Sequence, residues 1–153
     1  MKPILEQGYF GVGLDNPKNS MNVGAALRAV GVYGGKMIAI SNHRYSKASS
    51  DTMTFSSRLP LLQCDNLHGM IPFNCIPVAV DIVDGAVDLR TYKHPKRAFY
   101  VFGAEDATLG ARVLDWCRDT VYVPTNGCMN LAATVNVVLY DRMLKEANNE
   151  SNT

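Results

Sequence analysis

The chain has 153 residues, of which 47% are hydrophobic and 19% are charged, and its formal net charge at pH 7 is +1. This length is typical of one compact domain, which we expect over residues 1–147, followed by a disordered polar tail over 148–153. The sequence has neither a run of about 18 apolar residues nor a charged and then apolar leader, which argues against membrane insertion and export and favours the cytoplasm.

Short β-rich runs alternate along the chain with segments of helical pattern. The expected strands cover residues 9–14, 37–40, 77–81, 97–103 and 120–123. The expected helices cover about 20–33, a short segment after Asp65, 109–117 and about 130–147. This alternation predicts an α/β fold in which helices flank a mostly parallel sheet. Ligands of such folds bind beyond the carboxyl ends of the strands.

The last expected helix has two apolar surfaces. One is a stripe that should pack on the sheet, formed by Leu131, Val135, Val138, Leu139 and Met143. The other is formed by Ala132, Ala133, Val137 and Tyr140. The second surface fits either a partner subunit or deeper burial within the monomer.

Cysteines and histidines are scattered through the chain, without a C-x-x-C pair or a metal-ligand spacing. The spacing therefore predicts reduced thiols and no metal site. Basic residues gather in two places. They are Lys36, His43, Arg44, Lys47 and Arg58 in the first half, and the run 93–97 in the second. Each cluster fits either contact with nucleic acid or a solvated surface.

The segment 16–29 leads from the first expected strand into the first helix. Ser20 or Asn22 could cap that helix by accepting hydrogen bonds from its first free amides. Helical side chains lean toward the N-terminus, so Arg28 should pass over Gly24, which has no side chain, and reach the loop beyond the strand. There the guanidinium could contact a phosphate or a ribose. The alternative is a surface arginine paired with a carboxylate.

Two later expected strands also end abruptly and lead into loops with polar residues. One passes through Gly103, which allows close approach of a ligand, to Glu105, which could bind a ligand or neighbouring backbone amides. The other runs from Pro124 to Asn130, which could cap the last helix or lie at a ligand site. No G-x-G-x-x-G sequence is present, which disfavours a Rossmann dinucleotide site.

Taken together and in this order, the three loops resemble the three motifs of the SpoU (TrmH-like) family of the SPOUT superfamily, which are RNA 2′-O-ribose methyltransferases. The matching segments are Asn22-x-Gly24-x-x-x-Arg28, Phe102-Gly103-x-Glu105, and Pro124 through Cys128-Met129-Asn130-Leu131. The resemblance implies a deep trefoil knot near the C-terminus, S-adenosylmethionine as cosubstrate, an RNA substrate and a homodimer.

The same resemblance assigns roles to individual residues. It implies that Arg28 acts at the target ribose and that Asn22, Glu105 and Asn130 shape the reaction centre. It implies that the cofactor contacts the backbone near Ala79, Gly103, Val123, Cys128 and Leu131. The expected RNA contacts are Arg28, Lys18, Arg44 and Lys47. Because arginine almost never loses its proton, we expect Arg28 to position the substrate rather than to act as the base.

The chain departs from the family pattern at three positions. Cys128 and Ala132 replace serines, and Thr108 replaces a glycine. These changes favour an alternative function, a knotted protein that binds RNA or S-adenosylmethionine without methyl transfer. A third interpretation, an unrelated α/β nucleotide-binding domain, requires an accidental match of all three motifs. The Met129-Asn130-Leu131 sequence resembles small family members that methylate the wobble ribose of tRNA, which is therefore the expected substrate.

Overall fold

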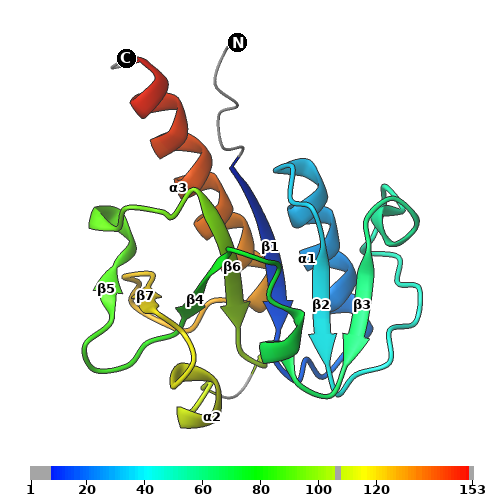
Figure 1. The fold of residues 1–153 in the computed structure, drawn as a ribbon. Coiled ribbons are helices and arrows are strands. Elements are labelled where there is room, and N and C mark those ends of the chain that lie inside the picture. Colours follow the sequence, from blue (N-terminus) through cyan, green and yellow to red (C-terminus); the bar gives the residue numbers. More distant parts are fainter. Residues whose placement is uncertain (1–7, 106–107, 152–153) are drawn as a thin grey trace.

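The structure is a computed structural model that describes residues 8–105 and 108–151. Its centre is one sheet of seven strands in the order β3-β2-β1-β6-β4-β7-β5 (Figure 1). All neighbouring strands pair in parallel. The strands are β1 (Tyr9–Leu14), β2 (Ile38–Ser41), β3 (Leu61–Cys64), β4 (Ile76–Val80), β5 (Val87–Asp88), β6 (Arg97–Phe102) and β7 (Asp119–Tyr122). This sheet confirms the predicted α/β fold. β3 and β5, at its two edges, were not predicted.

The helices include two long ones, and the remaining helical segments are short. They are α1 (Ser20–Val32), α2 (Ala111–Leu114), α3 (Leu131–Ser151) and the 3-10 helices η1 (Phe55–Ser57), η2 (Leu67–Met70) and η3 (Leu89–Thr91). The helix expected after Asp65 is η2, and the one expected over 109–117 is only one turn long. Residues 148–151, expected in a disordered tail, continue α3. The rest of the expected tail, 152–153, and residues 1–7 of the expected domain lie outside the described residues.

α1 and α3 pack side by side on one face of the sheet (Figure 1). The buried residues between them and the sheet include Val12, Leu27, Val30 and Val135. The opposite face is covered by η2, α2 and nearby loops, through a second cluster that includes Leu67, Phe99 and Val113. Because both faces of the sheet are covered, its central strands are apolar along nearly their whole length.

The predicted packing of α3 needs one correction. Met143, placed in the stripe that faces the sheet, is 46% exposed, whereas Val135 and Val138 are fully buried. Val137 and Tyr140 are exposed as well, so the interpretation of their surface as buried within the monomer is wrong for these two residues, whereas Ala132 of the same surface is buried. An exposed apolar surface therefore remains on α3.

Buried polar contacts fix α3 to the segment before β6. The Arg142 side chain, which is almost fully buried, donates to the backbone carbonyls of Pro95 and Lys96 at 2.8 Å and to the Tyr100 hydroxyl at 3.0 Å. His94 lies between the Tyr100 hydroxyl and the Asp141 carboxylate, 2.7 Å from each. Arg142 is acceptable in this interior because its donors are paired.

Candidate active site

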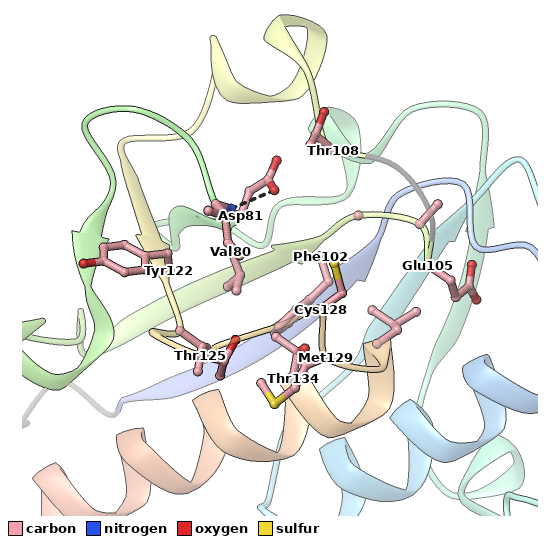
Figure 2. Close-up of a pocket in the computed structure, with 15 residues that line it drawn as sticks. Val80, Asp81, Phe102, Glu105, Thr108, Tyr122, Thr125, Cys128, Met129 and Thr134 are labelled. Carbon is pink, nitrogen blue, oxygen red and sulfur yellow. Dashed lines mark hydrogen bonds between the residues drawn. The ribbon is translucent and has the colours of Figure 1, made fainter.

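A cavity of about 390 Å³ opens at the carboxyl ends of β4, β6 and β7, where they meet the start of α3 (Figure 2). Its walls combine apolar side chains with a few polar groups. The lining residues are Val80, Asp81, Ile82, Phe102, Gly103, Ala104, Glu105, Thr108, Tyr122, Val123, Thr125, Cys128, Met129, Leu131 and Thr134. The position is the one expected for a ligand site in a parallel α/β sheet, and the size suits a small molecule.

The structure brings most of the predicted cofactor residues to this cavity. Gly103, Val123, Cys128 and Leu131 all line it, although they come from three different segments of the chain. Ala79 does not line it, because it is fully buried within β4, one residue before the cavity wall begins at Val80.

Asp81 is a polar residue of the cavity that the sequence analysis did not single out. One oxygen of its carboxylate accepts a hydrogen bond from the Leu109 backbone N–H at 2.8 Å. The other oxygen accepts one from the Ile82 backbone N–H, also at 2.8 Å (Figure 2). The carboxylate thus holds the loop after β6 near the end of β4. An acid directly after a buried apolar strand was the available signal, but the expected strand 77–81 included Asp81.

Three predicted reaction-centre residues form one hydrogen-bonded chain at the side of the cavity that faces α1. Asn22 donates from Nδ2 to Glu105 Oε1 at 2.8 Å, and Asn130 donates from Nδ2 to Asn22 Oδ1 at 3.3 Å. The other oxygen of Glu105 accepts from the Lys18 backbone N–H at 3.1 Å. Asn22 therefore links the side chains of the other two motif loops, Glu105 and Asn130, and Glu105 also lines the cavity.

The caps of the two long helices explain why these asparagines can meet. Asn19, rather than Ser20 or Asn22 as predicted, caps α1, because it is the extended residue just before the helix and its side chain accepts from the Asn22 N–H at 2.9 Å. The side chain of Asn22 thus stays available to Glu105. Asn130 caps α3 with its Oδ1, which accepts from Ala132 at 2.9 Å, and uses only its Nδ2 to reach Asn22.

Arg28 does not join this chain. It lies six residues after Asn22 on α1, which places the two side chains about 120° apart around the helix. The predicted path over Gly24 is wrong, since the loop 48–51 covers that glycine. A Cβ on Gly24 would lie 3.1 Å from the Ala48 Cβ. Arg28 is exposed, and no residue of the described chain forms a hydrogen bond or an ion pair with it.

Three of the four predicted RNA contacts, all except Arg28, lie in loops at the carboxyl end of the sheet. Lys18, Arg44 and Lys47 are all exposed, Lys18 in the loop after β1 and the other two in the segment after β2. Lys18 belongs to the loop 16–20 and contacts Glu105 through its N–H, and the segment of Arg44 and Lys47 contacts the same loop through Ser46 and Ser20. The basic residues of this end of the sheet thus lie beside the reaction-centre chain.

The four cysteines are free thiols. Burial raises the pKa of Cys117 to about 12, so this thiol stays protonated and packs with the apolar residues of α2. Among residues 8–105 and 108–151, no three His, Cys, Asp or Glu side chains come together as metal ligands would. In the same part of the chain, no helix is both long and apolar enough to cross a membrane.

Comparison with known proteins gives one family and a set of similar folds. The model of the SpoU rRNA Methylase family matches residues 9–140. Searched against curated proteins, the sequence has no match. Among solved structures, the AdoMet-bound rRNA methyltransferase of Sinorhizobium meliloti has a TM-score of 0.75 and 21% identity, over 89% of this chain and 56% of that one.

Two further structures resemble the chain at similar identity. The TrmH/SpoU tRNA modifying enzyme of A. aeolicus has a TM-score of 0.80 and 19% identity, over 93% of this chain and 78% of that one. A structure that gives insights into the 2-OH methylation of C/U34 on tRNA has a TM-score of 0.78 and 18% identity, over 92% of this chain and 98% of that one. The chain thus spans just over half of the Sinorhizobium protein and nearly all of the last one.

Proposed function

This chain belongs to the SpoU rRNA methylase family, and from that premise we propose that it is a cytoplasmic, S-adenosylmethionine-dependent RNA 2′-O-ribose methyltransferase. We propose tRNA as its substrate, with the wobble ribose as the methylated position, and residues 1–147 as its single catalytic domain. The observation that carries the proposal is that Glu105 takes part in both the cavity and the reaction-centre chain. It lines the cavity and accepts hydrogen bonds from the Asn22 side chain and from the Lys18 N–H.

The cavity has the chemistry that S-adenosylmethionine requires. Apolar walls from Val80, Phe102 and Leu131 suit the adenine ring, and each Asp81 oxygen keeps a second acceptor site after its one hydrogen bond to the backbone. We propose that Asp81 orients the cosubstrate by accepting from a hydroxyl or an ammonium group. When bound, S-adenosylmethionine supplies an electrophilic methyl group on a sulfonium.

The residues at the rim would position the ribose. Asn22, Glu105 and Asn130 are held rigidly by one another and by the α3 cap, which favours catalysis by orientation of the attacking hydroxyl. Arg28, exposed and without a partner in the described chain, carries a free positive charge. We assign it to a phosphate or ribose of the RNA.

A homodimer would bury the exposed apolar surface described on α3. Its residues are Val137 (38% exposed), Tyr140 (50%), Met143 (46%) and Leu144 (43%). Met21 and Val32 of α1 are also exposed. We propose that a second copy of the chain covers this surface and joins two modest basic edges, since one chain has a net charge of only +1. Tyr140→Glu should shift the chain from dimer to monomer in light scattering coupled to size exclusion. An unchanged mass would contradict this interface.

The knot of the family is also proposed for this chain. β7 pairs with β4 on one side and with β5 on the other, so the segment between β4 and β6 passes around it. The same segment is fixed to α3, since Lys145 donates to the carbonyls of Leu89 and Tyr92. We infer that the chain leaves β7 through this loop on its way to α3. An experimental trace of residues 81–131 tests the threading.

The decisive experiment is transfer of labelled methyl from S-adenosylmethionine to unmodified total tRNA, followed by mapping of the product. The proposal predicts label on a ribose 2′-oxygen and a large loss of methyl transfer in Arg28→Ala. It predicts full activity in Lys36→Ala, which removes a charge at the amino end of the sheet, opposite the cavity. Label on a base, or no label with an active related enzyme run in parallel, would overturn it.

The exposed Cys128 and Thr108 favour one second candidate, a protein that binds RNA or S-adenosylmethionine without transferring a methyl group. Both side chains line the cavity where the family usually has serine and glycine. This candidate predicts binding without transfer, and transfer that appears in the Cys128→Ser, Thr108→Gly double variant.

A further inference from the structure

A second, polar pocket, shallow and largely open to solvent, lies between the ends of β2 and β3, at the same carboxyl end of the sheet as the cavity. It is lined by Asn42, His43, Arg44, Gln63, Cys64 and Asp65. Five of these six residues are polar or charged. The pocket therefore suits a ligand that is recognised by hydrogen bonds rather than by apolar contact.

The backbone of this pocket is fixed by its own contacts. Asn42 has a left-handed φ of 54°, and its N–H donates to the Cys64 carbonyl at 2.9 Å. Its side chain donates to Asn16 Oδ1 at 2.7 Å. The Tyr45 N–H donates to Gln63 Oε1 at 2.8 Å. The walls are thus held in place before any ligand arrives, which lowers the entropic cost of binding.

Several polar groups of the pocket remain unused. His43 uses Nε2 to contact Ser20 Oγ at 3.1 Å, and Gln63 uses only its carbonyl oxygen. Within the described residues, the Arg44 guanidinium, the Asp65 carboxylate, Nδ1 of His43 and Nε2 of Gln63 have no partner. This set combines donors with one strong acceptor. The edge of an unpaired nucleobase presents the complementary groups, and a nearby phosphate suits the arginine.

The pocket is close to the proposed reaction centre. Asn16 contacts the pocket through Asn42, and the Lys18 N–H contacts Glu105. Asn16 and Lys18 are two residues apart along the chain, so their Cα atoms lie at most about 7 Å from each other. One RNA strand can therefore reach both places with neighbouring nucleotides.

We propose that this pocket binds an unpaired base of the substrate RNA, next to the nucleotide whose ribose is methylated. Asp65, His43 and Gln63 select the base, and Arg44 contacts its phosphate. This inference rests on the proposed methyl transfer to RNA, and it adds a second point of sequence selection beside the target nucleotide.

The test uses two variants whose side chains anchor nothing in the fold, Arg44→Ala and Asp65→Ala, with Lys36→Ala as the control for loss of a charge. After the methylated position in total tRNA is mapped, transcripts with each of the four bases at the two flanking positions are compared. The wild-type chain should prefer one base by roughly 5- to 150-fold in kcat/KM. Asp65→Ala should reduce this preference to less than about 3-fold, as expected when a base contact is lost.

Arg44→Ala should raise the KM for RNA about 10-fold and leave kcat and the KM for S-adenosylmethionine unchanged. Two results together would show that the pocket is not a base site. Both variants would keep the base preference of the wild-type chain, and their KM for RNA would equal that of Lys36→Ala. If the wild-type chain transfers no methyl group, the proposed function fails, and binding of total tRNA then tests the pocket alone. Weaker binding by Arg44→Ala than by Lys36→Ala supports the pocket, and equal binding overturns it.

Discussion

Glu105→Gln should remove most of the methyltransferase activity with little effect on the fold. The substitution keeps the size of the side chain but replaces one carboxylate oxygen by an amino group. Both oxygens of Glu105 accept hydrogen bonds, from Asn22 Nδ2 at 2.8 Å and from the Lys18 N–H at 3.1 Å. A glutamine can accept only one of them and places a donor against the other.

The chain cannot escape this conflict by turning an amide. If Asn22 rotates its side chain to accept from the new glutamine, its own amino group then faces Nδ2 of Asn130. Asn130 cannot turn in response, because its Oδ1 caps α3 through the Ala132 and Ala133 N–H groups. One hydrogen bond to a charged group is therefore lost, at a cost of about 1.5–3 kcal/mol. Since Glu105 is partly exposed, we expect the lower end of this range. The motif loops then separate in most molecules while the chain stays folded, so the fraction with the active arrangement, and with it kcat/KM, should fall roughly 10- to 30-fold.

The assay is steady-state methyl transfer to tRNA, with thermal unfolding measured on the same samples. Glu146→Gln is the matched control, because Glu146 pairs with Arg142 at the far end of α3 and is exposed. The reasoning is refuted if Glu105→Gln keeps kcat/KM within 2-fold of the wild type, or if Glu146→Gln loses as much.

Three further predictions concern the fold. Arg142→Ala should lower the free energy of unfolding in urea by about 3–5 kcal/mol, because it leaves buried acceptors unpaired, and a loss below 1 kcal/mol would show that water replaces the guanidinium. Gly31→Ala should cost about 1–3 kcal/mol despite better helix propensity, since its Cβ would overlap the Phe55 ring, and a stabilised variant would contradict this packing. Burial lowers the pKa of His94, so the unfolded chain binds its proton more readily and the unfolding free energy should fall as the pH drops below about 6.5. The His94→Gln variant should lose less between pH 7.5 and 5, and equal pH dependence would exclude His94 as the cause.

The sequence predicted the centre of the fold better than its edges. Strands buried on both faces, such as β4 and β6, are long apolar runs that stand out from the polar segments around them. β3 pairs on one side only and its residues are half exposed, so its sequence has no such contrast. β5 has only two residues and is extended because it pairs with β7, which local sequence does not encode.

The candidate site could be predicted where the residue type itself carries the information, and less well where tertiary contacts decide. Glu105 and Asn130 stood out as polar residues that follow apolar strands, and in the structure both form a hydrogen bond with Asn22. The course of Arg28 depended on whether Gly24 was open, which a loop 24 residues later decides. Asp81 was hidden because a strand and the loop after it differ only in their distant partners.

The position of α3 in the chain has a consequence during protein synthesis. The cavity takes Leu131 and Thr134 from this last helix, and Arg142 fixes the helix to the segment before β6. While the helix is still inside the ribosome, a nascent chain can pair its strands but has no complete wall for the cavity. The growing polypeptide therefore completes the wall of this cavity only after α3 has left the ribosome, and a chain that terminates before Leu131 lacks part of that wall.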